Sequence, residues 1–377
     1  MIARRRRLVL LVALALAVLA SCSFGRSPAP SPTPPQASID YVELQAAIED
    51  EITTGSLVLD NIRAVLVSVA GETRVSHYRH GFTARDTVHI WSVTKSVTST
   101  LVGIAHSEGI LPSLDQTLSH LLAQHRSSMS RSVAAVTLRQ LLTMSGGFPG
   151  TDPPYSTVRR IFESEDDLVA FILKQGQETP TGTQFVYSNA SSHLVAAVLA
   201  TALRRTDGDH PRSVLEYARA RLFEPLGIDT DPAWVEPLLD HRAADFVEAG
   251  FGWGTDPKGI PLGALGLRLT APDLVKLGEL YLNDGAWQGR QIFGVDWVEQ
   301  VTTPSALQPN YGFMWWLDTS WNGHQLYAAR GSEGQTIVVI PDQRAVIAIM
   351  SANNSEYALS EDALVPMIND VIIPRLG

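Results

Sequence analysis

Ser92 and Lys95 are a pair of residues whose types and spacing suit covalent chemistry. They stand three positions apart in "WSVTK", and on a helix that spacing places both side chains on one face. The chain holds only four lysines against 25 arginines, and a lysine, unlike an arginine, loses its proton readily when it is buried. A serine beside a neutral lysine can pass its proton to the amine and attack a carbonyl group. The spacing therefore predicts a serine nucleophile with its own general base.

The element that must position this pair is a helix that starts at Ser92. Its buried stripe is formed by three apolar residues at helical spacing, Val97, Leu101 and Ile104. Gly109 is expected to close the helix as a C-terminal cap. At the start of a helix, unpaired amide groups and the positive end of the dipole favour a developing oxyanion. The same positive end, with burial against Trp91, is expected to shift Lys95 towards its neutral form.

The rest of the folded region has strand patterns near both ends and helical patterns between them. The candidate strands are 63–71, 72–81, 324–330, 335–342 and 345–352, and the short connections of the last three favour antiparallel hairpins. The candidate helices are 41–53, 138–144, 163–175, 191–205, 213–227, 270–285 and 361–373. We predict an α/β (α+β) fold, with an antiparallel sheet flanked by terminal helices. Its α/β domain would comprise 39–110 and 310–377, with a mostly helical domain inserted over 111–309.

Four segments, taken in their order along the chain, resemble the serine β-lactamase and penicillin-binding-protein superfamily: "SVTK", "LRQLLTMSGGF", "FVYSN" and "ALGLRLTAPDLVKLGELYLNDGAWQGRQI". The resemblance runs from about Ile39 to the C-terminus and is strongest to class C-like hydrolases, family VIII esterases and 6-aminohexanoate-oligomer amidases. It implies a β-lactamase/transpeptidase-like fold in which Ser92 is acylated and Lys95 is its base partner. It also implies that Tyr187 is a second proton-transfer group and that Asn189 binds the carbonyl region of the substrate. From its position alone, Tyr187 would be an ordinary core or surface residue.

The chain departs from this superfamily at the third motif, where a lysine or histidine precedes Thr-Gly or Ser-Gly on an inner strand. The corresponding segment is "AARGSEGQTIVVIP". Arg330 either supplies the missing positive charge to a substrate or pairs with an acidic neighbour such as Glu333, and the sequence leaves both alternatives open. The strand around Gly331 can still donate a backbone N–H to an oxyanion. The departure argues against recognition of a β-lactam or peptidoglycan carboxylate.

The sequence therefore predicts a serine hydrolase acting through an acyl-enzyme on an ester or amide. The alternatives are a β-lactamase or D-alanyl-D-alanine carboxypeptidase and, in another class, a non-catalytic ligand-binding lipoprotein that keeps the fold. No G-x-S-x-G segment occurs, which argues against a Ser-His-Asp hydrolase. Glu279 in "ELYLN" is expected on a solvated helix face.

The composition is that of an ordinary globular protein with core enough for an enzyme, and the partner implied by the resemblance is a small-molecule ester or amide. Apolar residues make up 45% of the 377 residues, charged residues 18%, and the net charge is −10. Nucleic-acid surfaces need clustered positive charge, and apart from Arg4 to Arg7 the arginines are scattered, so no nucleic-acid partner is expected. His77 and His80 would point to opposite sides of a strand, and we predict neither a metal nor a cofactor.

The N-terminal region predicts export. The run Arg4 to Arg7 precedes an apolar segment, Leu8 to Ala20, that is too short for the ~20-residue bilayer core but suits a signal peptide over 1–21. The segment "LASC", ending at Cys22, resembles the lipobox of bacterial lipoproteins, and 22–38 is a Pro/Ser-rich tether. We expect a lipid anchor on Cys22 that holds the protein on the outer face of the bacterial cell membrane. The alternative is a secretory signal with an incidental cysteine.

Overall fold

The computed structural model describes residues 40–150, 166–231, 250–352, 359 and 361–376. The chain from Ser38 to Gly377 forms one compact unit, so the division into 39–110 with 310–377 and 111–309 stays a prediction. The expected signal peptide, Cys22 and the tether lie outside the described residues. Within the described ranges, no helix combines the length and the apolar character needed to cross a membrane.

The main sheet is antiparallel, with six strands in the order β2-β1-β11-β10-β9-β8. Its strands are β1 (Ile62–Val69), β2 (Glu72–Tyr78), β8 (Trp316–Trp321), β9 (His324–Arg330), β10 (Thr336–Ile340) and β11 (Ala345–Ser351). The predicted hairpins near the C-terminus are confirmed as β9, β10 and β11. Strand β8 is not among the strands predicted from the sequence.

Strand β1 shows how this sheet separates two cores. Val65 and Val67 pack into the core beneath the terminal helices, whereas Ala64 and Leu66 face the larger core on the other side. This alternation is the two-residue period of a strand with both faces buried. The central strands β10 and β11 are buried along their whole length, which explains their continuous apolar sequence.

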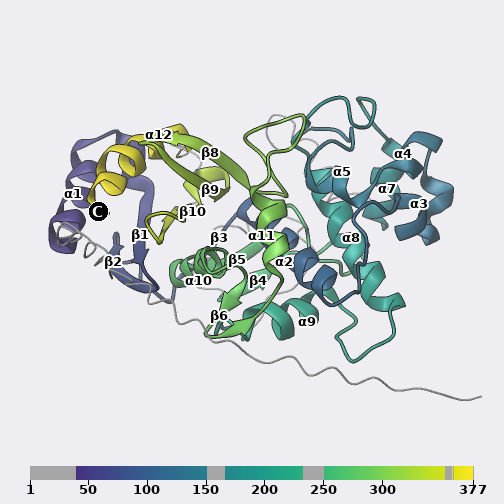
Figure 1. Cartoon of the computed structure of the whole chain (residues 1–377), viewed down its shortest axis with the longest axis horizontal. Coiled ribbons are helices and arrows are strands. Elements are labelled where there is room, and N and C mark those ends of the chain that lie inside the picture. The colour runs from purple at the N-terminus through teal and green to yellow at the C-terminus, as the bar shows by residue number, and fades with distance from the viewer. Residues whose placement is uncertain (1–39, 151–165, 232–249, 353–358, 360, 377) are drawn as a thin grey trace, which may run out of the picture. The chain divides into compact units, whose positions relative to one another are not determined.

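Helices from the two ends of the chain cover one face of the sheet. Figure 1 shows α1 (Tyr41–Thr54) and α12 (Glu361–Pro366) on the same side of the molecule, beside β1. Asp40 caps α1 by accepting hydrogen bonds from two backbone N–H groups. Leu44 and Ile48, four residues apart, and Leu364 all lie in the core that includes Val65. The predicted sheet flanked by terminal helices is confirmed.

The other face of the sheet packs against α10 (Ala271–Leu282). Gly278 permits this contact, because an added Cβ would collide with Val346 on β11. Glu279 is buried, with 8% exposed, and its carboxylate accepts a hydrogen bond from Ser68 on β1. The expectation of a solvated position for Glu279 is therefore wrong, because the sheet covers that side of the helix.

The remaining elements include the helix that carries Lys95 and begins after Ser92. The helices are α2 (Val93–Ser107), α3 (Leu118–Leu121), α4 (Arg131–Ala135), α5 (Leu138–Leu142), α7 (Leu168–Gln175), α8 (Asn189–Arg205), α9 (Val214–Ala218) and α11 (Val295–Thr302). A small sheet has the order β3-β5-β4, and two further strands form a hairpin: β3 (Thr87–His89), β4 (Gly252–Trp253), β5 (Leu267–Thr270), β6 (Ala286–Trp287) and β7 (Arg290–Gln291). Helix α8 is buried along most of its length and packs against α2 and α5.

Candidate active site

Ser92 lies at the junction between a short strand and α2. The Ile90 N–H donates to the Leu267 carbonyl on β5 (2.9 Å), so the small sheet holds the chain just before the helix. Trp91 has a φ of 47°, a left-handed conformation that turns the chain sharply into α2. Ser92 is the N-cap of α2, yet its side chain makes no capping hydrogen bond. The hydroxyl of Ser92, a partly buried residue, is therefore not used to cap the helix.

The Lys95 amine is enclosed by three neutral oxygen atoms. Only 1% of Lys95 is exposed. The three oxygens and their distances from Lys95 Nζ are Ser92 Oγ (2.9 Å), Asn189 Oδ1 (2.7 Å) and the Ala264 carbonyl oxygen (3.1 Å). The Ser92 contact follows from the predicted helical spacing, since the two residues share the first turn of α2.

Burial lowers the pKa of Lys95 from 10.5 to about 7. The cause is loss of hydration, because neutral oxygens replace only part of the water that stabilises an ammonium ion. The sequence predicted the direction of this shift from the helix dipole and burial against Trp91. In the structure, burial of the amine among several elements is the cause. At neutral pH a large share of Lys95 is thus uncharged and able to accept a proton.

Asn189 reaches Lys95 because α8 begins at this point. Ser188 caps α8 by accepting from the Ser191 N–H (3.1 Å), and Asn189 is the first helical residue. Helix α8 packs against α2, and the contact between Asn189 and Lys95 shows that their first turns meet. The Asn189 oxygen accepts from Lys95, which leaves the side-chain NH₂ group to donate elsewhere.

Tyr187 lies beside the same amine. The centre of its ring is 4.8 Å from Lys95 Nζ. Ring contacts with Trp316 (5.6 Å between centroids) and Tyr311 (6.1 Å) orient the phenol. Tyr311 is fully buried, and burial, with a smaller effect of Tyr187, raises the pKa of Tyr311 well above its ordinary value. Of these two tyrosines, the partly buried Tyr187 is the one next to the amine.

His89, three residues before Ser92, is not placed to act as a base. Burial, with a smaller effect of Arg268, lowers the pKa of His89 to about 3. Its Nε2 atom accepts a hydrogen bond from the Gly266 N–H (2.6 Å). A ring nitrogen with so low a proton affinity cannot hold the serine proton at neutral pH.

The end of β9 lies against the backbone around Ser92. A Cβ added to Gly331 would be 2.5 Å from the Ile90 carbonyl oxygen and 3.2 Å from the Ser92 nitrogen, so glycine is needed for this approach. The Gly331 N–H donates to the Gln335 carbonyl (2.8 Å) and is therefore already used within the chain. The next N–H group along the chain belongs to Ser332, which begins a 3₁₀ turn.

Arg330 forms an ion pair with Asp318 on β8, with 3.3 Å between Nη2 and Oδ2. The two side chains are 18% and 21% exposed, so the pair is largely shielded from solvent. An acidic partner was one of the two alternatives left open by the sequence, with Glu333 as its example. The structure shows Asp318 as an acidic partner, on β8, which is not among the predicted strands. A role for Arg330 in substrate binding stays a prediction.

The structure thus brings together Ser92, Lys95, Tyr187 and Asn189, all of which the sequence analysis selected. It adds Ala264, which was missed because a backbone carbonyl leaves no trace in residue type. It also adds Asp318, whose pairing depends on the register of β8 with β9.

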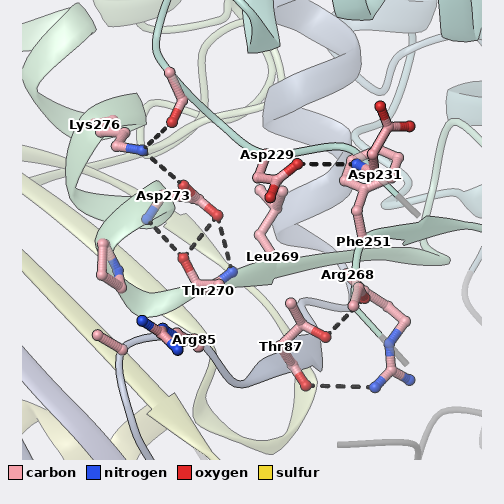
Figure 2. Close-up of a pocket in the computed structure, with 14 residues that line it drawn as sticks. Arg85, Thr87, Asp229, Asp231, Phe251, Arg268, Leu269, Thr270, Asp273 and Lys276 are labelled. Atoms are coloured by element: carbon pink, nitrogen blue, oxygen red, sulfur yellow. Dashed lines mark hydrogen bonds and ion pairs between the residues drawn. The ribbon is translucent and has the colours of Figure 1, made fainter. Parts of the chain in front are cut away.

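Figure 2 shows a pocket of about 370 Å³ that contains none of these residues. It lies where β3 and β5 meet the start of α10. Thr270 and Asp273 form the capping box of α10, and Lys276 pairs with Asp273 at 3.0 Å. These polar groups serve the local fold, and we assign no chemistry to the pocket.

Solved structures of hydrolases share the fold. A proposed 6-aminohexanoate-dimer hydrolase from Bacillus anthracis is 20% identical, with a TM-score of 0.66 over 86% of this chain and 83% of that one. A family VIII carboxylesterase is 13% identical, with a TM-score of 0.65 over 89% and 97%. A D-stereospecific amidohydrolase from Streptomyces sp. is 17% identical, with a TM-score of 0.61 over 87% and 96%. At these identities the likeness shows the fold alone. No curated protein matches the chain.

The Beta-lactamase family model matches residues 61–365, from the start of β1 into α12. This span includes the Ser92 helix, the Tyr187 segment and the end of β9. It covers most of the chain and confirms the resemblance inferred from the ordered motifs. The chain therefore belongs to the beta-lactamase family, whose members are hydrolases that mostly use a serine.

Proposed function

We propose that this protein is a serine hydrolase that cleaves an ester or amide through an acyl-enzyme on Ser92. The observation that carries this proposal is the set of contacts around Lys95. A neutral amine has two N–H groups and one lone pair, and the oxygens of Asn189 and Ala264 can only accept. With both N–H groups engaged there, the lone pair is left for the Ser92 hydroxyl at 2.9 Å. This is the arrangement that a general base requires.

In the first step, Ser92 Oγ bonds to the substrate carbonyl carbon while its proton passes to Lys95 Nζ. The carbonyl oxygen gains the negative charge, and the N–H groups of Ser92 and Ser332 are the proposed donors to it. When the intermediate collapses, the bond to the leaving group breaks and that group takes the proton from Lys95, directly or through Tyr187. Water then adds to the acyl carbon, gives a proton to Lys95, and releases the acid as Ser92 recovers its proton.

We propose an uncharged ester or amide as the substrate class. The support is the Arg330–Asp318 ion pair, because a substrate carboxylate would have to compete with Asp318 for the guanidinium. A lost charge-assisted hydrogen bond costs about 1.5–3 kcal/mol, which corresponds to about one to two powers of ten in kcat/KM. An uncharged substrate does not make this interaction and loses nothing.

Comparison of kcat/KM for several substrates, measured with the purified protein under the same conditions, tests this proposal. Short-chain p-nitrophenyl esters, small amides, nitrocefin and benzylpenicillin would be compared for wild type, Ser92→Ala and Ser56→Ala. Ser56 is exposed and makes no capping hydrogen bond, so its variant is a control for the loss of a hydroxyl. We expect kcat/KM to be higher for the esters than for the β-lactams, and only Ser92→Ala to abolish turnover.

Two results would replace the proposal. Higher kcat/KM for β-lactams would favour a β-lactamase or a carboxypeptidase, with Arg330 released to the substrate. An absence of Ser92-dependent turnover, together with no acylation detectable by mass spectrometry, would favour a non-catalytic binding protein.

A further inference from the structure

A buried pair, His193 and Asp256, takes no direct part in the steps proposed above. His193 Nε2 lies 3.2 Å from Asp256 Oδ2, and the two side chains are 5% and 0% exposed. Burial acts to raise the pKa of Asp256, but hydrogen bonds from His193 and two backbone N–H groups lower it overall. Asp256 is therefore charged in the protein interior. A buried pair of this kind contributes little net stability, so its role is better sought in what it holds in place.

Asp256 organises the turn between β4 and β5. Its Oδ1 atom accepts from the N–H groups of Lys258 (2.9 Å) and Ile260 (2.8 Å). Its backbone carbonyl accepts from the Gly259 N–H (2.9 Å), which closes the turn. The carboxylate thus ties the turn together with one oxygen and attaches it to α8, through His193, with the other.

The segment that follows this turn, before β5 begins, brings the Ala264 carbonyl to Lys95. Gly263 lies directly against α8, since an added Cβ would collide with the Ser192 carbonyl oxygen. On the opposite side, Thr98 of α2 donates to the Gly263 carbonyl (3.1 Å). The Ala264 carbonyl comes next and accepts from Lys95 Nζ (3.1 Å). Residues 263–264 are therefore held between α2 and α8.

We propose that His193 and Asp256 are positioning residues that hold the Ala264 carbonyl against the Lys95 amine. Helix α8 carries Asn189 and His193 four residues apart, on one face. One helix thereby sets two acceptors of Lys95: Asn189 directly, and Ala264 through the turn fastened by Asp256. This inference rests on the proposed role of Lys95 as the base. Because no side-chain substitution removes a backbone carbonyl, the His193–Asp256 pair is the means by which this contact can be tested.

The pair is not a Ser-His-Asp relay. The Ser92 hydroxyl contacts Lys95, whereas His193 Nε2 faces Asp256. The other ring nitrogen of His193 is buried and has no hydrogen-bond partner among the residues described. His193 therefore has no nitrogen that contacts the nucleophile.

Hydrogen–deuterium exchange of the whole chain tests the positioning without any substrate. His193→Leu removes the donor to Asp256 and keeps apolar volume, whereas His193→Gln places an amide N–H close to the position of Nε2. We expect the amides of 254–266 to exchange at least about tenfold faster in the leucine variant and at the wild-type rate in the glutamine variant. Glu279→Gln, which alters another buried carboxylate, is the matched control and should leave this segment unchanged. Unchanged exchange in the leucine variant would overturn the proposal.

The pH dependence of kcat/KM then tests the link to Lys95. When the hairpin formed by β4, the turn at Asp256 and β5 loosens, water replaces the Ala264 carbonyl beside Lys95. The amine is then rehydrated, so the pKa of Lys95 rises. The base must be neutral, and the acidic limb of the profile should therefore move to higher pH by about one unit in His193→Leu. His193→Gln and Glu279→Gln should keep the wild-type limb. Faster exchange of the hairpin without a shift of the limb would also overturn the proposal, because it would mean a purely structural role.

Failure of this inference can be told apart from failure of the proposed function. If turnover depends on Ser92 but the acidic limb of the kcat/KM profile does not move in His193→Leu, only the inference is contradicted. No Ser92-dependent turnover contradicts the proposed function, while the exchange measurement still decides whether the pair holds the hairpin. If His193→Leu does not fold, Asp256→Asn is measured in its place, since its amide oxygen can still accept from the N–H groups of the turn.

Discussion

Lys95 Nζ lies 2.9 Å from Ser92 Oγ within the first turn of α2, and the lysine is almost fully buried. This relationship couples a serine hydroxyl to an amine whose pKa is lowered to about 7. A buried lysine beside a carboxylate would keep its proton, but the oxygens around Lys95 are neutral. The site therefore favours proton acceptance over charge pairing.

Replacement of Lys95 by arginine should remove the base while keeping a cation. Arginine does not release its proton in proteins, so acylation of Ser92 should slow by at least about 100-fold. Stopped-flow acylation with a p-nitrophenyl ester measures the effect, and circular dichroism checks that the variant folds. Lys174→Arg, at an exposed position on α7, is the matched control and should acylate like wild type. Near-normal acylation of Lys95→Arg would rule out the proposed mechanism.

The lowered pKa of Lys95 predicts the direction of the pH profile. Lys95 accepts the serine proton only when it is neutral, so kcat/KM for an ester should rise with pH through about 7 and level off above it. A lysine with its ordinary pKa near 10.5 would place the rise more than three units higher. Steady-state rates from pH 5 to 10, corrected for spontaneous ester hydrolysis, distinguish the two. A profile that falls as pH rises through 7 would assign the limiting group to an acid instead.

A side chain at Gly331 should disturb the site through contact with the backbone before Ser92. The added Cβ of Gly331→Ala would be 2.5 Å from the Ile90 carbonyl oxygen, so the end of β9 must move away. Displacement of a donor to the oxyanion typically costs about 100-fold in rate, and we expect a loss of that order in kcat. Ser332→Ala keeps the backbone N–H at an exposed position and should retain activity. Equal rates for Gly331→Ala and wild type would exclude this strand from the oxyanion site.

Cys22 is proposed as the site of a lipid anchor. The thiol is the only one in the chain, so Cys22→Ser should incorporate no radiolabelled palmitate when expressed in a bacterial host. Loss of the acyl chains removes their hydrophobic attachment, and the variant should shift from the membrane fraction to the soluble fraction. Label on the serine variant, or none on the wild type, would contradict lipidation at this residue.

Much of the site could be predicted because its elements are local in sequence. The Ser92–Lys95 contact depends on spacing within one helical turn, and that spacing is the same wherever the helix lies. Tyr187 and Asn189 were predicted through the resemblance of the "YSN" segment to the superfamily, and α8 begins at Asn189, two residues before the helix predicted over 191–205. The hairpins of β9, β10 and β11 follow from short connections between apolar runs.

Other features depended on contacts between distant segments and were missed or misjudged. Glu279 has the sequence context of a solvated helix face, yet it is buried because the sheet lies over it and Ser68 supplies a hydrogen bond. One partner of Arg330 is Asp318, twelve residues earlier, on the strand β8 that pairs with β9. In both positions the environment is supplied by another element, and helical or strand periodicity carries no information about it.

The sequence by itself determined the contact between Ser92 and Lys95, the order of the motifs and the antiparallel pairing near the C-terminus. Only the tertiary structure decided the proton affinity of Lys95, because desolvation depends on every element packed around the amine. The Ala264 carbonyl reaches Lys95 from 169 residues away, along a hairpin that His193 and Asp256 attach to α8. Every residue carries a backbone carbonyl, so only the fold can select the one that meets the amine.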